Sequence, residues 1–366
     1  LSENSALTGV VESERYYYSS IGNIARRSKS GTDWDGIGSP PGINNAISVS
    51  LVQMGNPNSA EGRRYFAAFN SQEGAETGLF ELTDLDGSVE WSRLTVGYGA
   101  STLLEIASLL TVDGDNDGWP DELYASVRTT SVNDAPRFVL LRQPGMDDET
   151  VITFDVRDPD TGVVETVTAL DQMIDAAYVE GRGYWFVGDK GWLYTLSEGA
   201  TNGTALTGTS ASGYPVYDGI SGKGFSGIDA VDLGLLGGEN GTTALFVTDT
   251  EGRVWATVDG GANWVMKDVS GRALTDLTWI PRAGEGGNGA FLVGTQPFIP
   301  QNVSDQGLYQ LQATGDGSTV AIDGLEAPDT SNYNTSDLQD ATVRSFYRPD
   351  SGSPPNITKY ETNVFV

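Results

Sequence analysis

The stretch Ala244-Leu-Phe-Val-Thr-Asp-Thr-Glu-Gly-Arg-Val-Trp-Ala-Thr-Val-Asp-Gly-Gly-Ala-Asn-Trp264 decides the fold of this chain. It holds two short runs of β-branched and aromatic residues, separated by a turn that ends at Gly252. A second, glycine-rich turn follows the second run. Runs of this composition between Gly, Asp and Asn turns are strand signals, so the stretch predicts consecutive strands joined by tight turns.

The second of these runs recurs along the whole chain. Its copies begin at Gly22, Gly78, Pro136, Gly191, Gly252 and Gly307. Successive starting positions differ by 56, 58, 55, 61 and 55 residues. An interval this regular indicates a structural repeat of about 57 residues.

Three further strand-like runs accompany the copies of this repeat. One precedes each copy, as Ala244–Thr248 does, and another lies earlier still, as in Ile228–Leu233. A third follows, as in Trp264–Lys267. Four short strands per repeat, without helical periodicity, predict a propeller blade. We therefore expect an all-β fold, a six-bladed β-propeller of four-stranded antiparallel blades, with residues 1–366 forming a single domain.

The two ends of the chain predict how the ring closes. The N-terminal repeat begins with Arg15-Tyr-Tyr-Tyr18, which we interpret as a second strand, so this repeat lacks an innermost strand. Thr342-Val-Arg-Ser-Phe-Tyr347 has the composition of an innermost strand. We expect it to complete the N-terminal blade, because closure removes open sheet edges. Residues 357–366 fall outside this count and are expected to be an added strand or an exit segment.

The charge balance bears on partners and habitat. Fifty acidic residues against 21 basic ones give a net charge of −29. Such a surface repels nucleic acid phosphates and anionic lipid, so we expect neither nucleic acid binding nor direct membrane insertion. Excess carboxylate, whose repulsion salt screens, is typical of proteins from high-salt organisms or their viruses. The alternative is an acidic secreted protein from an ordinary marine organism.

The chain contains no histidine and no cysteine. Ser-His-Asp triads, thiol nucleophiles and zinc sites of His and Cys are thereby excluded, which leaves carboxylates, tyrosine or a calcium-bound water as enzymatic options. The first residue is Leu1 and no signal-peptide pattern follows, so we interpret the chain as a mature form or a fragment. Candidate glycosylation sites are the Asn-x-Ser/Thr sequons at Asn202, Asn240, Asn302, Asn334 and Asn356.

The turn Thr257-Val-Asp-Gly-Gly-Ala-Asn-Trp264 resembles the Asp-box of sialidase-type (BNR repeat) β-propellers. The family pattern is Ser/Thr-x-Asp-x-Gly-x-Thr-Trp, and Asn263 stands where threonine is usual. Asp84–Trp91 keeps the aspartate and the tryptophan, whereas Ser30–Trp34 keeps only the glycine–tryptophan spacing. The resemblance implies a structural role, in which the aspartate binds turn amides and the tryptophan packs between sheets. It implies no activity.

Asp113-Gly-Asp-Asn-Asp-Gly-Trp-Pro-Asp121 is the sharpest candidate for a metal site, and the metal is Ca²⁺. Four carboxylates and one backbone carbonyl are the expected ligands, from Asp113, Asp115, Asp117, Asp121 and Trp119 respectively. The loop is similar to the calcium loop of FG-GAP propeller repeats, which implies a structural ion between the first two strands of a blade. An acidic solvated turn is the alternative. A second candidate, Asp158-Pro-Asp160, is better explained as a plain turn.

Aromatic residues in the longest loops are the candidate ligand-binding residues. They lie in the linkers 207–224 and 322–340 and in the hairpin insertion 297–306, at Tyr214, Tyr217, Phe298 and Tyr333. Exposed aromatic rings among Gly, Ser and Asn are typical of contacts with glycan or protein. The alternative is that these rings hold the long loops in place.

Together these features favour a non-catalytic module that is extracellular, at a cell surface or on a virion. We expect it to bind a protein or a glycan, or to be a structural component of a larger surface assembly. The first alternative is a sialidase-like carbohydrate-active enzyme, although the Arg-Ile-Pro signature of that family is absent and the nearest string is Trp279-Ile-Pro-Arg282. The second is an assembly-factor propeller, resembling those that help build photosynthetic complexes.

Overall fold

The structure is a computed structural model. It describes residues 7–12, 16–21, 23–28, 35–38, 40, 46–55, 62–71, 77–83, 89–94, 104–112, 120–129, 137–141, 149–157, 161–179, 181–206, 224–269, 273–280, 290–295, 307–326, 342–348 and 359–365. The chain divides into two compact units. The first comprises Leu1–Asp155, Thr166–Ile174 and Gly199–Gly203, and the second comprises Val156–Glu165, Asp175–Glu198 and Thr204–Val366.

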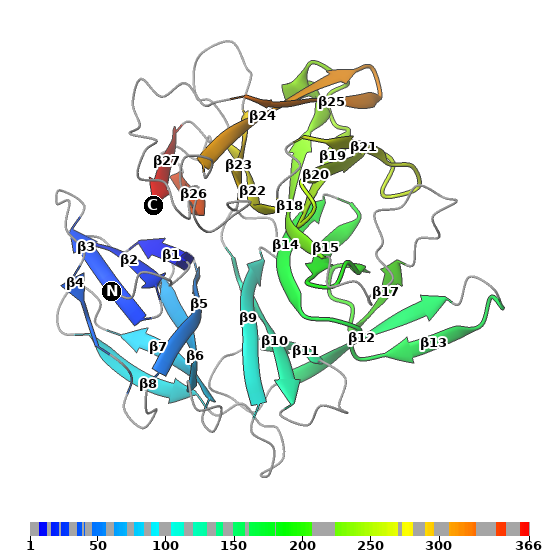
Figure 1. Cartoon of the computed structure of the whole chain (residues 1–366). Coiled ribbons are helices and arrows are strands. Elements are labelled where there is room, and N and C mark those ends of the chain that lie inside the picture. Colours follow the sequence, from blue (N-terminus) through cyan, green and yellow to red (C-terminus); the bar gives the residue numbers. More distant parts are fainter. Residues whose placement is uncertain are drawn as a thin grey trace. The chain divides into compact units, whose positions relative to one another are not determined.

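Two four-stranded antiparallel sheets belong to the first unit, and their strands follow chain order (Figure 1). The strands of the first sheet are β1 (Leu7–Glu12), β2 (Tyr16–Ile21), β3 (Asn23–Ser28) and β4 (Asp35–Gly36). The strands of the second are β5 (Ala46–Met54), β6 (Arg64–Ser71), β7 (Thr77–Thr83) and β8 (Glu90–Leu94). Each sheet is a simple meander, because every strand pairs with its successor.

The middle of the chain forms a nine-stranded sheet. It contains the meander β9 (Leu104–Val112), β10 (Glu122–Thr129), β11 (Arg137–Leu141) and β12 (Glu149–Arg157), with β13 (Val164–Val167) paired to β12. It also contains the meander β14 (Met173–Val179), β15 (Gly183–Gly188), β16 (Leu193–Leu196) and β17 (Asn202–Leu206). β12 and β17 are neighbours in the strand order, so two four-stranded repeats are hydrogen-bonded into one sheet.

The second unit holds two more four-stranded antiparallel sheets. The strands of one are β18 (Phe225–Asp232), β19 (Thr243–Asp249), β20 (Arg253–Thr257) and β21 (Val265–Asp268), with the 3₁₀-helix η1 (Leu233–Leu236) after β18. The strands of the other are β22 (Leu274–Ile280), β23 (Ala290–Thr295), β24 (Gly307–Asp316) and β25 (Thr319–Glu326). β26 (Thr342–Arg348) and β27 (Lys359–Phe365) form a two-stranded sheet.

These sheets confirm the all-β prediction and the succession of antiparallel strands within each repeat. The quoted runs Ala244–Thr248, Gly252–Trp255 and Trp264–Lys267 correspond to β19, β20 and β21, in hydrogen-bonded order. The sheets of the described residues contain two, four or nine strands, so a count of six separate blades stays a prediction.

The predicted closure by Thr342–Tyr347 is wrong. These residues lie in β26, which pairs with β27 over the register Thr342↔Phe365 to Arg348↔Lys359. Residues 7–12 instead supply the first strand of the N-terminal sheet, as β1 pairs with β2. The physical reason is that a short run containing Gly9 gives little side-chain signal for a strand, so the sequence alone does not indicate residues 7–12 as the first strand.

A register irregularity recurs where the first strand of a sheet pairs with the second. It occurs in β5, β9, β18 and β22, where one additional residue interrupts the ladder at Val49, Ala107, Ser226 and Thr275 respectively. Such β-bulges bend the strand and increase its twist. The shared position shows that the repeat extends to backbone geometry as well as strand number.

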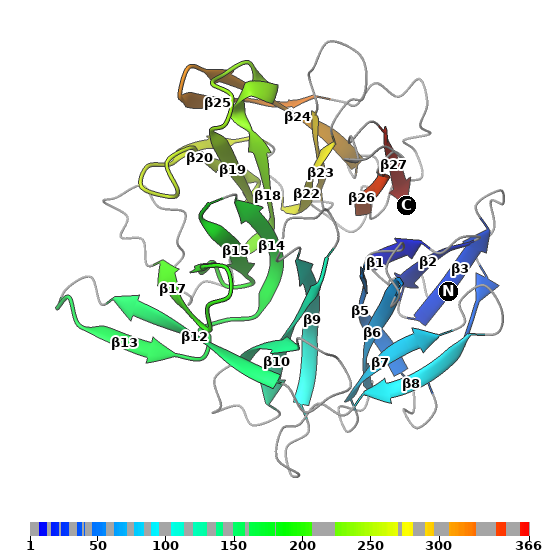
Figure 2. The same cartoon turned by 180° about the vertical axis from the view of Figure 1, so that it is seen from behind.

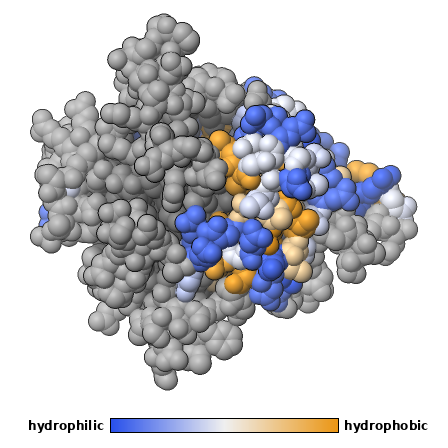
Figure 3. All heavy atoms as spheres, turned by 90° about the horizontal axis from the view of Figure 1, so that it is seen from above, coloured by the Kyte–Doolittle hydropathy of each residue, from blue (hydrophilic) through white to orange (hydrophobic). Residues whose placement is uncertain are grey.

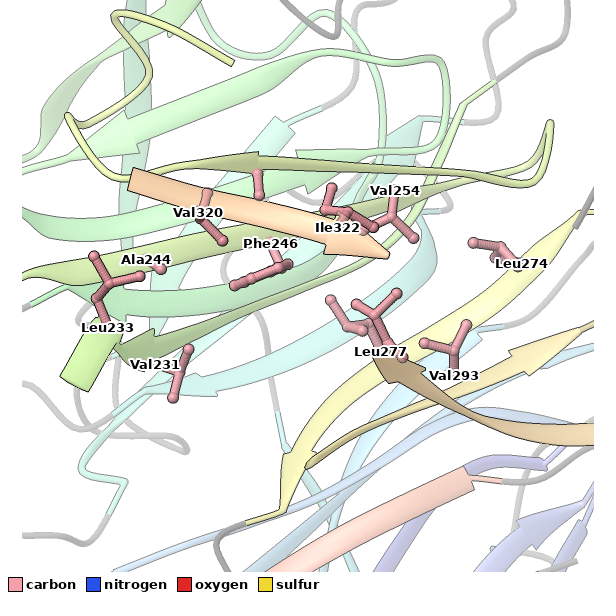
Figure 4. Close-up of a cluster of buried hydrophobic side chains, with 12 residues drawn as sticks. Val231, Leu233, Ala244, Phe246, Val254, Leu274, Leu277, Val293, Val320 and Ile322 are labelled. Carbon is pink, nitrogen blue, oxygen red and sulfur yellow. The ribbon is translucent and has the colours of Figure 1, made fainter. Parts of the chain in front are cut away.

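Apolar side chains from successive sheets form the cores. In the second unit, a cluster joins β18–β21 to β22–β25 (Figure 4). Phe246 and Leu277 lie near its centre, and Val320 and Ile322 extend it from β25. Separate clusters of the first unit surround Phe69 in β6 and Leu123 in β10. Because burying apolar area is the main favourable term in folding, these contacts hold neighbouring sheets together.

The long β24–β25 hairpin also reaches the η1 segment of the preceding sheet, and Figure 2 shows these elements of the second unit from behind. The Glu239 amide donates to the carbonyl of Gly317 at 2.7 Å. A Cβ atom on Gly315 would lie 2.7 Å from the amide nitrogen of Gly238, so the two backbones approach at glycine. No helix within the described residues is long and apolar enough to cross a membrane.

Candidate functional site

The turn between β20 and β21 is the best-defined polar cluster of the structure. Thr257 Oγ1 donates to Asp259 Oδ1 at 2.8 Å and accepts from the Gly261 amide at 3.1 Å. The backbone amide and the side-chain amide of Asn263 both donate to the Asp259 carboxylate, at 2.9 and 2.7 Å. The indole N–H of Trp264 donates to the Gly261 carbonyl at 3.1 Å. These hydrogen bonds fix both the aspartate and the tryptophan.

The same contacts set the ionisation of Asp259. Partial desolvation acts to raise its pKa, but the hydrogen bonds from the side chain and backbone of Asn263, from Thr257 and from the Ala262 amide outweigh that cost. The pKa of Asp259 therefore lies below its ordinary value of 3.8. Hydrogen-bond donors favour the ionised carboxylate over the neutral acid, and this lowers the pKa of Asp259.

Two glycines bring this turn against the β14–β15 hairpin. Gly260 and Gly261 adopt positive φ angles of 72° and 83°. A Cβ atom on Gly260 would overlap Arg182 Nη1, and one on Gly261 would lie 3.0 Å from Trp185 Cη2 and 3.6 Å from Trp264 Cζ2. The positive φ and the close contacts both require glycine here. The turn is therefore an inter-sheet contact within the second unit.

A second carboxylate occupies the turn between β19 and β20. Asp249 is fully buried, and it accepts hydrogen bonds from the amides of Glu251 and Arg253 at 2.8 and 3.0 Å. Arg253 Nε also donates to it at 2.8 Å, and the Trp255 indole N–H donates at 3.0 Å. Arg253 also forms an ion pair with Glu251. A buried charge needs such partners, and Asp249 has four of them.

Polar side chains on the first strands connect successive sheets within each unit. Ser50 Oγ in β5 accepts from the amide of Leu109 in β9 at 3.1 Å. Asp175 Oδ2 in β14 accepts from the amide of Ile228 in β18 at 2.8 Å. Ser108 Oγ in β9 donates to the carbonyl of Met173. These bonds tie β5 to β9, β9 to β14 and β14 to β18 by satisfying backbone groups of these strands.

The predicted calcium loop lies mostly outside the described residues. Residues 113–119, which include Asp113, Asp115, Asp117 and Trp119, are among those not described. Asp121 is described and exposed, and its amide donates to the carbonyl of Val112 at 3.0 Å. The described part of the chain shows no group of three or more His, Cys, Asp or Glu placed to hold a metal ion.

Of the other predicted site residues, some lie within the described residues and some outside them. The aromatic residues all lie outside the described residues, as do three sequons, and these are Tyr214, Tyr217, Phe298, Tyr333, Asn302, Asn334 and Asn356. The exposed Asn202 begins β17, and its side-chain oxygen accepts from Thr153 Oγ1 at 2.9 Å. The exposed Asn240 lies in the turn between η1 and β19.

Sequence reasoning missed the buried Asp249 and the bridging Asp175. A weak signal existed for the second, because Ile174-Asp-Ala in β14 and Ile228-Asp-Ala in β18 are the same tripeptide on successive first strands. Both aspartates also accept a hydrogen bond from the amide of the following alanine. Asp249 had no such signal, since its burial depends on the fold around it.

Comparison with known proteins supports the fold. No protein-family model and no curated protein matches the sequence. Among solved structures, an ancestral GH74 enzyme overlaps 98% of this chain with a TM-score of 0.57 and 13% identity. The overlap spans 46% of that enzyme's chain. A structure of YCF48 bound to D1 peptide overlaps 88% of this chain and 82% of its own, with a TM-score of 0.47 and 11% identity.

A computationally designed Ika8 protein overlaps 84% of this chain and 72% of its own, with a TM-score of 0.45 and 9% identity. At these identities the similarity concerns the fold alone. The architecture is β-propeller-like, in agreement with its successive antiparallel meanders.

Proposed function

We propose that this chain is a non-catalytic β-propeller that works at the surface of a cell or a virion, as a binding or adhesion module or as a structural component of a surface assembly. One observation carries this proposal: the carboxylates that are held most firmly are bound to the chain's own turns and strands. Asp249, Asp259 and Asp175 each accept hydrogen bonds from backbone amides. Groups used in this way build a scaffold.

The proposal includes a six-bladed ring and an Asp-box at Thr257–Trp264. The hydrogen bonds of Asp259, and the position of Gly261 close to both Trp185 and Trp264, agree with the role that the Asp-box resemblance implies. Trp91, which ends the related stretch Asp84–Trp91, is likewise packed between rings. Six repeats of the β-meander, β1–β4, β5–β8, β9–β12, β14–β17, β18–β21 and β22–β25, support the count.

A structural Ca²⁺ ion in the loop 113–121 is part of the proposal. The ends of this loop are joined by β9 and β10, in which Val112 pairs with Glu122. The Gly55 amide also donates to the Pro120 carbonyl at 2.6 Å, which fixes one end of the loop. A short loop closed at its base holds its carboxylates near one another, and Ca²⁺ relieves their repulsion.

Chelation tests this ion directly. We expect EDTA to lower the melting temperature of the purified chain, because an ion that binds only the folded state stabilises it by mass action. Added Ca²⁺ is expected to restore the transition, and Asp115→Asn with Asp117→Asn is expected to melt at the lower temperature with or without EDTA. An identical transition with and without chelator contradicts the ion.

The surface role and the high-salt, acidic character are tested together. We expect the labelled chain to bind to intact cells of salt-requiring microorganisms at high salt, and to show no turnover of sialosides or β-glucans. The net charge of −29 supports the choice of salt. Hydrolysis of any of these glycans, without cell binding, favours the carbohydrate-active alternative. Capture of a membrane-complex subunit as the sole ligand favours the assembly-factor alternative.

Aromatic residues in the long loops are proposed as the contact residues for the protein or glycan ligand. The rings of aromatic residues combine apolar area with few rotatable bonds, which suits them to ligand contact. The proposed contact residues are Tyr214, Tyr217, Phe298 and Tyr333. Glycosylation is proposed at the sequons, of which Asn202 and Asn240 are exposed. Intact-mass measurement of the native protein distinguishes glycosylated from unmodified chains.

A further inference from the structure

Strand β12 takes part in three pairings along its length, with β11, β17 and β13. Its first half pairs with β11, over Ile152↔Phe138 to Glu149↔Leu141. At Thr153 its amide donates to the Thr201 carbonyl at 3.0 Å. Beyond that point β12 pairs with β13, and Thr166 Oγ1 in β13 donates to Asp155 Oδ1 at 2.7 Å. The described residues 155–157 and 161–166 therefore belong to a two-stranded ribbon, which we call the β12–β13 arm.

The β13 side of this arm is open to solvent. Val163 and Val164 are each 54% exposed, and every residue from Thr161 to Thr166 is exposed. Residues of a strand point alternately to opposite faces, so the exposed Val164 and the half-buried Val167 of β13 lie on opposite sides of the ribbon. Figure 3 shows orange, hydrophobic surface next to blue, hydrophilic surface at the right-hand tip, where β12 and β13 lie in Figure 1.

The arm is incomplete as a sheet. Among the described strands, β13 pairs with β12 alone, so no described strand covers its other edge. A two-stranded ribbon without a packed face is marginal in water, and a third strand is the usual remedy. An edge strand with a valine on each face, here the exposed Val164 and the half-buried Val167, is a template for an added strand.

Charge decides which kind of strand fits. The segment 149–167 carries five carboxylates and one arginine, Arg157, for a net charge of −4. Two copies of the arm side by side would bring these carboxylates together. A segment with lysine or arginine beside β-branched residues would instead pair charge with charge across the added strand.

We propose that the open edge of β13 binds an extended basic segment of another protein by β-strand addition. Backbone hydrogen bonds to Val164–Val167 supply affinity, and the valines contact apolar side chains of the partner on both faces. The partner would therefore be a protein with an extended basic segment. This inference rests on the binding role proposed above.

The test uses the complete chain and a fluorescent octapeptide of alternating lysine and valine. We expect saturable binding by fluorescence anisotropy, and slower hydrogen exchange at Val164–Val167 when the peptide is bound. Val164→Asp is expected to weaken binding by about tenfold or more, even though it adds a negative charge. The matched control is Val265→Asp in β21, another exposed valine, which is expected to bind as the unmodified chain does.

Several results would overturn the inference. The first is the absence of saturable binding. The second is equal binding by both valine variants, which indicates general attraction to an acidic surface. The third is a dimer that Val164→Asp abolishes, which makes a second copy of the chain the occupant of the edge. Because exchange at β13 is measured on the unmodified chain, misfolding of a variant does not decide the matter. If the chain binds cells but not the peptide, this inference is wrong and the proposed function is unaffected. If the chain hydrolyses glycans, the proposed function is contradicted and the peptide result is unaffected.

Discussion

The start of the fourth strand is anchored differently in two sheets. In β18–β21, polar groups hold it: Asp259 accepts from Thr257 and Asn263. In β5–β8, aromatic rings lie at the corresponding place, and Trp91 packs edge-on against Phe69 and Phe80, with ring centroids 5.3 and 6.1 Å away. The comparison teaches that the repeat needs its fourth strand anchored, and that either hydrogen bonds or aromatic packing can do this.

A cavity among the aromatic rings of the β5–β8 sheet is the test of this comparison with the largest expected effect. Phe69 is fully buried and contacts both other rings, so Phe69→Ala is expected to lower the free energy of unfolding by about 3–5 kcal/mol. Denaturant unfolding measures this, with Phe69→Leu as a control that keeps most of the volume and costs roughly 1 kcal/mol. A loss below that of the control would show that the rings do not anchor β8.

Removing the polar anchor is expected to have a smaller effect. Asp259→Ala leaves the donors of Thr257 and Asn263 without their acceptor. The Asn263 amide is exposed and can bind water, whereas the Thr257 hydroxyl is buried, so we expect a loss of about 1–2 kcal/mol. The same unfolding measurement applies. Asp259→Asn keeps one side-chain oxygen, so its free energy of unfolding is expected to lie between those of the unmodified chain and Asp259→Ala. A loss as large as that of Phe69→Ala would mean that the polar turn is the more important anchor.

Acid provides the smallest and most selective test. The pKa of Asp259 is lower in the folded chain than its ordinary value, so its ionised form stabilises the fold above about pH 4, and this contribution is lost as the pH falls through the folded pKa. The stability difference between the unmodified chain and Asp259→Asn should therefore be present at neutral pH and shrink in acid. A constant difference across this range would show that ionisation of Asp259 contributes nothing.

Sequence patterns predicted the strands well, because strand signals are local. Alternating apolar residues and turn residues placed β5, β19 and β20 near their observed bounds. The turn at Asp259 was also predictable, since its residues are close together in the chain. The weakest element was β1, whose six residues include a glycine and only a short apolar run. Its omission led directly to the wrong closure by Thr342–Tyr347.

The buried partners of carboxylates were beyond the reach of sequence. Asp249 and Asp232 have similar surroundings in sequence, each at the end of a strand. Only the first is fully buried and bound to both an arginine and a tryptophan, whereas the second caps η1 through the amide of Gly234. Burial depends on which sheets pack together, and that information is not local.

The amino-acid sequence by itself determined an acidic all-β chain whose strands recur about every 57 residues, because composition and side-chain alternation are properties of neighbouring residues. Tertiary structure alone decided that β26 pairs with β27, that β12 leaves its sheet to form an arm with β13, and that Asp175 bridges to Ile228. These features depend on which strands and sheets come together in the fold, and no short stretch of sequence shows that.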